Sequence, residues 1–292
     1  MIKPLVSIII LSALRKACTQ RCLKSIDKFT MVSHEIIIVD MGGDKNIKKW
    51  LIGEEKKRNN LKVIFNAGNV GTSRGRNQGI KIAQGKYIVF LDNDIVVSKY
   101  WLFALIETFR RWPKIASAGS KIICPNNYVY IGDKYIYDTN DKGIRKIGLK
   151  VIKPYLSSDS KINIEKEVPW YSTGCLMVYS SILKNIGAFD ENLFSIEEDK
   201  DLCLKIKKIG KKIIYCPKSY VIHDRIRDSF YENHIRYKDI GRLKKDISYF
   251  EAKWDRKVEL IYSKKALKDI GYSEILIKQM TIGRLKDFFS VA

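Results

Sequence analysis

The fold is decided by the stretch Tyr87-Ile88-Val89-Phe90-Leu91-Asp92-Asn93-Asp94, an unbroken apolar run that ends in two aspartates. Apolar runs without alternation are typical of strands buried on both faces of a sheet. On an extended chain the side chains at positions i and i+2 point the same way, so Asp92 and Asp94 can converge on one divalent cation. A solvated strand end or turn explains an acidic triplet equally well when it is taken alone.

Three segments upstream of this stretch also read as a strand followed by a helix. The strands are expected at residues 6–11, 35–40 and 61–65, and the helix after the third one at about residues 72–84. This alternation predicts an α/β fold with a Rossmann-like, mostly parallel sheet flanked by helices. Ligands of such sheets bind beyond the carboxyl ends of the strands, where Asp40, Asn66 and Asp92 all lie.

Several short motifs follow one another in a specific order and spacing. They are Val6-Ser7-Ile8-Ile9-Ile10, Glu35-Ile36-Ile37-Ile38-Val39-Asp40, Asn69-Val70-Gly71, Arg76-Asn77-Gln78-Gly79, the stretch 87–94, Thr173-Gly174-Cys175, Ile186-Gly187-Ala188-Phe189-Asp190-Glu191, Glu198-Asp199-Lys200-Asp201-Leu202-Cys203 and Val221-Ile222-His223. Through them the chain resembles the family 2 glycosyltransferases, inverting enzymes of the GT-A fold, over about residues 5–230. The resemblance implies a metal-dependent enzyme that moves a sugar from a nucleotide-diphosphate donor, with a UDP-sugar as the default, to a hydroxyl acceptor.

The acidic cluster at 198–201 opens an amphipathic helix. Carboxylates in the first turn of a helix are stabilised by its dipole, so helix capping alone could account for them. Inverting transfer needs a base that takes the proton of the acceptor hydroxyl. By resemblance, Asp199 is that base, and Glu198 and Asp201 support it or face the acceptor.

His223 ends another apolar strand. A histidine in such a place is often structural, but a neutral imidazole also suits an ion such as Mn2+ that carboxylates already hold. The resemblance favours His223 as a third ligand of Mn2+ or Mg2+ beside Asp92 and Asp94.

Donor recognition is assigned to three residues by the same resemblance. Asp40 corresponds to the acid that meets the nucleotide base or ribose, although it could instead cap a turn. Arg76 and Asn77 correspond to a pair near the donor phosphates, where a guanidinium would bind anionic oxygen. An exposed polar helix face is the alternative for both. The segment Leu11-Ser12-Ala13-Leu14 departs from the family pattern, which leaves the nucleotide open.

The acceptor side is expected around residues 170–175. Aromatic faces pack against the C–H surfaces of sugars, and glycine permits close backbone approach, so Trp170 and Gly174 are candidates. Trp170 could equally be part of the core. Residues 125–165 are rich in turn chemistry and predict short strands with a mobile loop over the donor.

The net charge of the 292-residue chain is +22, from 54 basic and 32 acidic residues. A solvated lysine-rich exterior explains it, as does contact with an anionic membrane surface or with nucleic acid. No recognised nucleic-acid motif is present, which makes that partner unlikely by this test. Residues 231–292 are especially basic and predict a helical extension after a catalytic domain at 1–230, with Tyr249, Phe250 and Trp254 in the core rather than in a lipid.

Composition also bears on location. No run of eighteen apolar residues and no signal-peptide pattern occur, which predicts a cytoplasmic protein, with peripheral contact to the inner face of a membrane as an option. The six cysteines lack paired metal-type spacing and are expected to be reduced. The competing functions are a sugar nucleotidyltransferase, a basic nucleic-acid-binding protein and a non-catalytic sugar-nucleotide binder.

Overall fold

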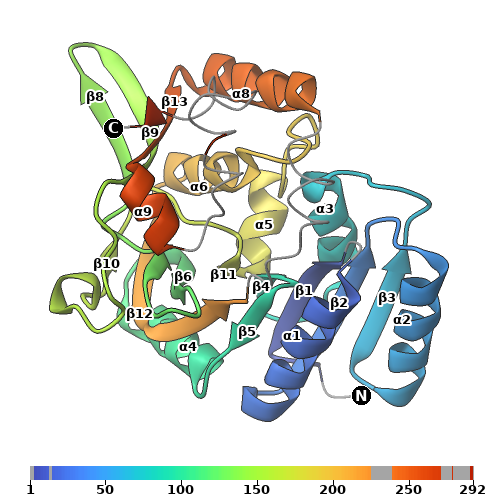
Figure 1. Cartoon of the computed structure of the whole chain (residues 1–292). Helices are drawn as coiled ribbons and strands as arrows, with labels where there is room; N and C mark the ends of the chain where they lie inside the picture. The colour runs from blue at the N-terminus through green and yellow to red at the C-terminus, as the bar shows by residue number, and fades with distance from the viewer. Residues whose placement is uncertain (1–2, 13–14, 225–238, 271–277, 279–289, 292) are drawn as a thin grey trace.

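The structure of this chain is a computed structural model, shown in Figure 1. It describes residues 3–12, 15–224, 239–270, 278 and 290–291. All statements below concern these residues.

The first half of the chain forms four parallel strands joined by helices. The elements are β1 (Val6–Ser12), α1 (Lys16–Phe29), β2 (His34–Asp40), α2 (Lys45–Lys57), β3 (Leu61–Phe65), α3 (Thr72–Ile82) and β4 (Tyr87–Asp92). Strand β1 pairs in parallel with both β2 and β4, and β2 pairs in parallel with β3. The predicted α/β architecture is confirmed, and the chain switches from one side of β1 to the other between β3 and β4.

The second half completes one large sheet. Its elements are β5 (Ile95–Val97), α4 (Trp101–Arg111), β6 (Ile115–Ile123), β7 (Val129–Ile131), β10 (Lys166–Glu167), β11 (Cys175–Tyr179), α5 (Ser180–Ile186), α6 (Glu198–Lys208) and β12 (Lys212–His223). The strand order is β10-β12-β6-β11-β4-β1-β2-β3, with β5 beside β12 and β7 beside β6. Strand β11 runs antiparallel to both neighbours, so the sheet is mixed.

Burial explains why the central strands are apolar throughout. Every residue of β6 is buried, as are the apolar residues of β1, β2 and β4 except Leu11. Because side chains alternate between the two faces of a strand, both faces of the sheet must be covered. The helices in Figure 1 lie along this sheet and supply that cover.

A smaller sheet lies beside the main one and includes residues from the predicted loop region. Strands β8 (Ile136–Asp141) and β9 (Ile144–Val151) form a hairpin, and β13 (Lys257–Tyr262) pairs with β9 in parallel. Strand β14 (Ser290–Val291) pairs with β13. The 3-10 helix η1 (Ser160–Ile162) follows the hairpin. The short strands predicted for 125–165 are present, and the mobile loop over the donor stays a prediction.

The C-terminal segment is not purely helical, which corrects the prediction. It contains α8 (Ile240–Trp254) and α9 (Lys264–Asp269), with β13 between them. Phe250 of α8 is fully buried in the main core, and Tyr249 and Trp254 pack against that core. The predicted core role of these aromatic residues is confirmed. Residues 231–238, 271–277, 279–289 and 292 of the predicted extension lie outside the described residues.

All six cysteines belong to the described part of the chain, and each is a buried free thiol. No described helix combines the length and the apolar character that a bilayer-spanning segment needs.

Candidate functional site

Three predicted metal ligands meet at one edge of the main sheet. The ligand atoms of Asp92, Asp94 and His223 all lie within 4.8 Å of one another. Strand pairing brings them together, because His223 at the end of β12 lies opposite Ile95 of β5, the residue after Asp94. Nε2 of His223 is 3.3 Å from Oδ1 of Asp94. Two carboxylates and an imidazole are a donor set that suits Mn2+.

The local geometry differs from the predicted one in a single respect. Strand β4 ends at Asp92, and Asn93 and Asp94 form the turn into β5. The two aspartates therefore approach each other through a turn and not through the i, i+2 alternation of a strand. The backbone N–H of Asp92 donates to the carbonyl of Gly174 (3.1 Å), and a Cβ at Gly174 would lie 3.3 Å from Oδ2 of Asp92. Gly174 thus lies next to Asp92 at this edge of the sheet.

Two residues that the sequence did not suggest also belong to this edge. The Arg15 guanidinium donates to Oδ2 of Asp94 at 2.8 Å, and both side chains are nearly buried. The Tyr130 ring stacks on His223 with ring centroids 4.9 Å apart. Arg15 is 79 residues away from Asp94 and directly follows the segment 11–14, where the chain departs from the family pattern, so no local signal marked it.

Arg76 connects this edge of the sheet to helix α6. Its guanidinium donates to Glu198 (2.8 Å) and lies 3.8 Å from Oδ1 of Asp92, and its side chain is buried. Glu198 is buried as well. In this structure the Arg76 charge is therefore shared between two carboxylates of the chain.

Asn77 makes contacts with another segment. Its side-chain amide donates to the Phe189 carbonyl and to Glu191, both at 3.0 Å, and accepts from the Phe189 backbone N–H at 3.1 Å. The side chain thus ties α3 to residues 189–191. This placement does not support the expected contact with donor phosphates, because the protein itself satisfies the amide.

Asp199 lies in the first turn of α6, next to Glu198. Burial, followed by the charge of Glu198, raises the pKa of Asp199 from its ordinary 3.8 to about 7. One carboxylate oxygen accepts from the Lys200 backbone N–H at 2.7 Å. A carboxylate with a pKa near neutrality is suited to proton transfer at physiological pH.

Asp40 is fully buried at the end of β2. Its Oδ1 accepts from the Gly43 backbone N–H at 2.9 Å, which is the turn-capping alternative. Its Oδ2 is buried and has no hydrogen-bond partner among the described residues. Burial raises the pKa of this carboxyl. Asp44, by contrast, caps α2 and accepts from two backbone N–H groups.

Two residues expected on the acceptor side are internal. Trp170 is 2% exposed, its indole N–H donates to the Tyr137 carbonyl, and Lys200 lies over its ring. Asp201 is fully buried and accepts from the Trp254 indole at 2.9 Å. A sugar needs an accessible surface, so the structure corrects both expectations in favour of structural roles.

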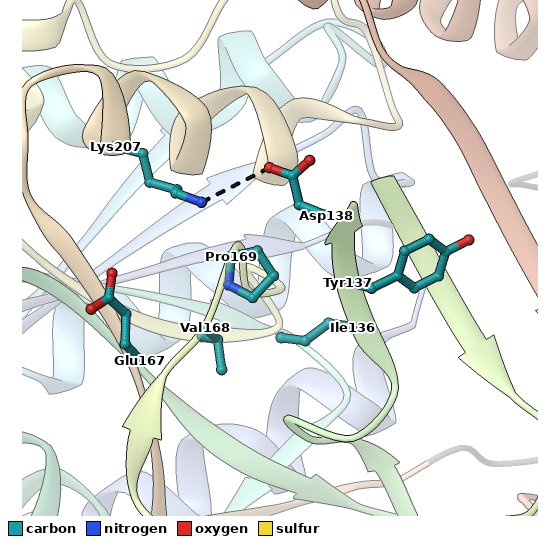
Figure 2. A pocket seen from close by; sticks show the side chains of 7 residues that line it. All are labelled: Ile136, Tyr137, Asp138, Glu167, Val168, Pro169 and Lys207. Carbon is teal, nitrogen blue, oxygen red and sulfur yellow. Dashed lines mark ion pairs between the residues drawn. The ribbon is translucent and has the colours of Figure 1, made fainter. Parts of the chain in front are cut away.

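The chain also has a hollow of about 460 Å³ beside the small sheet (Figure 2). In Figure 2, Lys207 near the end of α6 faces Asp138 of β8 across it, and the two charges are 3.9 Å apart. The lining residues are Ile136, Tyr137, Asp138, Glu167, Val168, Pro169 and Lys207, none of which was predicted as a site residue. The hollow flanks the end of α6, whereas Glu198 and Asp199 lie at the start of this helix.

Comparisons with known proteins identify the family of the chain. The sequence model of glycosyl transferase family 2 matches residues 7–186, more than half of the chain. The chain is 24% identical over 276 residues to glycosyltransferase GlyG of Streptococcus pneumoniae serotype 4, covering 91% of this chain and 82% of that protein. It is 22% identical over 222 residues to an N-acetylglucosaminyl-diphospho-decaprenol L-rhamnosyltransferase of Mycobacterium tuberculosis, covering 70% and 71%.

Solved structures share the fold at lower identity. GalNAc-T7 with UDP, GalNAc and Mn2+ aligns with a TM-score of 0.61 and 20% identity, over 87% of this chain and 51% of that one. The mannosyltransferase PcManGT of Pyrobaculum calidifontis, in complex with GDP-Man and Mn2+, aligns with a TM-score of 0.58 and 12% identity, over 98% and 70%. The fold is thus of the GT-A type, and the chain, a glycosyltransferase, belongs to glycosyl transferase family 2.

Proposed function

We propose that this glycosyltransferase moves a sugar from a nucleotide-diphosphate donor to a hydroxyl acceptor with inversion, and that it depends on Mn2+ or Mg2+. The observation that carries the proposal is the convergence of Asp92, Asp94 and His223 at the sheet edge. Arg76 links this edge to Glu198, the neighbour of Asp199. One continuous set of charged groups therefore extends from the proposed metal ligands to the proposed base.

Asp92, Asp94 and His223 would hold the cation. When bound, the cation would stabilise the negative charge that develops on the departing diphosphate. In both structural neighbours named above, the protein was solved with Mn2+ and a nucleotide or nucleotide sugar, which supports the same class of donor here.

Asp199 is the proposed general base. Its carboxylate would accept the proton of the acceptor hydroxyl while the hydroxyl oxygen forms a bond to the anomeric carbon and the bond to the diphosphate oxygen breaks. The raised pKa of Asp199 supports this role, because the conjugate acid would form readily at neutral pH.

Asp40 is the proposed contact to the nucleotide, and because this carboxyl is fully buried, the contact requires the segments that cover it to move aside when the donor binds. A buried carboxylate oxygen without a partner costs free energy unless a donor satisfies it, and the imide N–H of uracil is such a donor. This argument favours a UDP-sugar. For the acceptor we propose a hydroxyl on a glycan, a lipid-linked glycan or a peptide.

The proposal is tested by a panel of nucleotide sugars with Mn2+ or Mg2+, scored for slow donor hydrolysis and for thermal stabilisation of the chain. We expect one donor to stabilise the chain only when the metal is present and to release a nucleoside diphosphate. Release of pyrophosphate would instead indicate nucleotidyl transfer, and a complete lack of metal-dependent stabilisation would contradict the proposal.

A further inference from the structure

The backbone that leads into helix α6 is held by a carboxylate from the C-terminal segment. Asp246 of α8 is 1% exposed and accepts from three successive backbone N–H groups, those of Phe194 (3.1 Å), Ser195 (2.8 Å) and Ile196 (3.3 Å). Hydrogen bonds to an ionised acceptor are stronger than neutral ones. Asp246 therefore fixes the path of the chain just before α6 begins.

Helix α6 needs such external support. Its N-cap residue, Glu197, makes no side-chain capping bond and has a φ of 66°, a left-handed conformation that is uncommon for a residue other than glycine. Such a conformation costs of order 1–3 kcal/mol and persists only when the surroundings enforce it. Glu197 lies one residue after the segment that Asp246 holds, and Asp199 follows two residues later.

The same segment is also hydrogen-bonded to α3. The Phe194 carbonyl accepts from the backbone N–H (2.6 Å) and the hydroxyl (3.1 Å) of Thr72. Gly71 has a φ of 87°, and a Cβ there would lie 2.6 Å from the Phe194 ring. The Arg242 guanidinium of α8 lies over the same ring, 4.0 Å from its centroid. Phe194 is thus clamped between α3, which carries Arg76, and α8.

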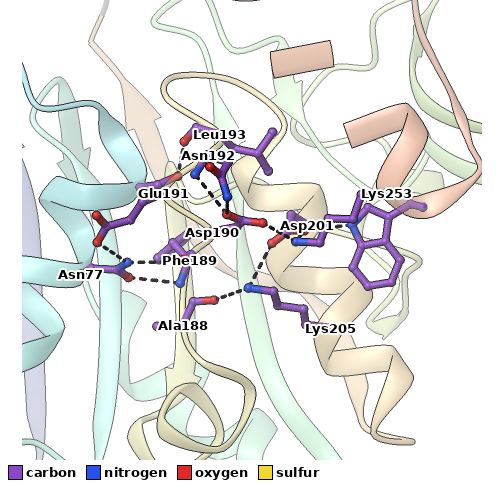
Figure 3. A network of polar contacts seen from close by, with 12 residues as sticks. Asn77, Ala188, Phe189, Asp190, Glu191, Asn192, Leu193, Asp201, Lys205 and Lys253 are labelled. Carbon is purple, nitrogen blue, oxygen red and sulfur yellow. Dashed lines mark hydrogen bonds and ion pairs between the residues drawn. The ribbon is translucent and has the colours of Figure 1, made fainter. Parts of the chain in front are cut away.

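Helix α8 is itself anchored to α6, as Figure 3 shows. Lys253 lies 2.6 Å from Asp190 and 2.6 Å from the buried Asp201 of α6, and the Tyr249 hydroxyl donates to Asp190. Because the anchor and the Asp246 contacts come from one rigid helix, the start of α6 is fixed relative to its body.

We infer that Asp246 is a positioning residue for Asp199, so that α8 belongs to the catalytic framework. The inference rests on the proposed function, because it assumes that Asp199 is the base. Small displacements of a reacting group can lower a rate about 100-fold, so loosening this segment should affect turnover more than donor binding.

The test compares three variants of the full-length chain with the wild type. Asp246→Asn replaces the carboxylate by a neutral amide, which offers the three N–H donors one acceptor oxygen in place of two. Arg242→Gln is a milder variant, which carries the test if Asp246→Asn does not fold. Asp239→Asn is the matched control: it makes the same chemical change at the N-cap of α8, where asparagine caps as well as aspartate. The readouts are kcat, KM, nucleotide affinity with Mn2+ by calorimetry, and the pH profile of kcat.

We expect Asp246→Asn to lower kcat about 30- to 100-fold and Arg242→Gln about 3- to 10-fold. Nucleotide affinity should stay within about 2-fold, the acid limb of the pH profile should move in Asp246→Asn, and Asp239→Asn should match the wild type. An active wild type with an equally active, folded Asp246→Asn would overturn the inference and leave the proposed function standing. So would a loss of nucleotide affinity that accounts for the whole defect. A wild type inactive with every donor would instead overturn the proposed function, and the inference with it.

Discussion

At Asp199 the requirements of chemistry and of stability conflict. The folded chain raises the pKa of this carboxyl to about 7 from its ordinary 3.8, through burial and the neighbouring Glu198. The folded state therefore binds this proton more tightly than the unfolded chain does. Stability falls as the pH rises from about 4 to about 7, because ionisation is disfavoured only in the folded state.

Asp199→Asn should separate the two effects. The amide keeps an oxygen that can accept from Lys200 N–H but cannot take a proton, so turnover should fall at least 1,000-fold by order of magnitude, while nucleotide binding changes little. Unfolding by urea should show the variant to be about 1–3 kcal/mol more stable than the wild type at pH 8, with the difference vanishing near pH 4. Full turnover, or a stability difference independent of pH, would contradict this account.

Asp94→Ala tests the metal ligands directly. The change removes the central carboxylate, which also pairs with Arg15 and His223, and should abolish Mn2+-dependent nucleotide binding. Calorimetric titration of Mn2+ provides the measurement. Asp141→Ala, at the exposed end of β8 next to the hairpin turn, is the control and should bind Mn2+ as the wild type does. Retained Mn2+ affinity in Asp94→Ala would remove this aspartate from the ligand set.

At the scale of elements, the contact between α6 and α8 depends on a buried charge. Asp201 is fully buried and meets Lys253, Lys205 and the Trp254 indole. Figure 3 shows Lys253 between Asp190 and Asp201. Removing one partner of a buried ion pair leaves an uncompensated charge inside the protein, which is more costly than losing an exposed pair.

Lys253→Met should therefore lower the free energy of unfolding by about 2–4 kcal/mol, measured in urea. Lys257→Met is a matched control, because Lys257 is largely exposed and forms a surface ion pair with Glu251, so its loss should cost no more than about 0.5 kcal/mol. Equal effects in the two variants would show that the Lys253 contacts do not hold α8 on α6.

The elements differ in how far the sequence predicts them. The apolar runs of β1 to β4 need both faces covered, so their pattern alone indicates strands of a buried sheet. Strand β13 gives no such signal, because only Tyr262 of its six residues is buried, and it forms by pairing with β9 more than a hundred residues earlier. The same limit applies to sites: motifs named Asp92, Asp94 and His223, which the structure brings together, whereas the contacts of Arg15 and Asp246 are with distant segments and leave no local signal.

At the scale of the whole molecule, the ion pairs within the chain leave a large excess of positive charge. Carboxylates such as Glu165, Asp138 and Asp190 pair with arginine or lysine within the chain, yet a net charge of +22 remains. A charge of this size attracts anionic surfaces over about one Debye length, roughly 10 Å at 0.1 M salt. Lipid-linked glycans, one of the proposed acceptor classes, lie at such surfaces.

The chain should accordingly co-sediment with vesicles that contain phosphatidylglycerol at low salt and should dissociate as the salt concentration rises. Each lysine or arginine near an anionic surface contributes about 1 kcal/mol, so binding should weaken by at least tenfold between about 0.05 and 0.5 M salt. Vesicles of phosphatidylcholine alone are the control and should bind little. Random-sequence duplex DNA, added as a competitor of equal charge, discriminates a general polyanion affinity from a membrane preference. Equal binding to both kinds of vesicle would contradict an electrostatic docking to the membrane surface. Release from the vesicles by DNA at low concentration would contradict a preference for membranes over other polyanions.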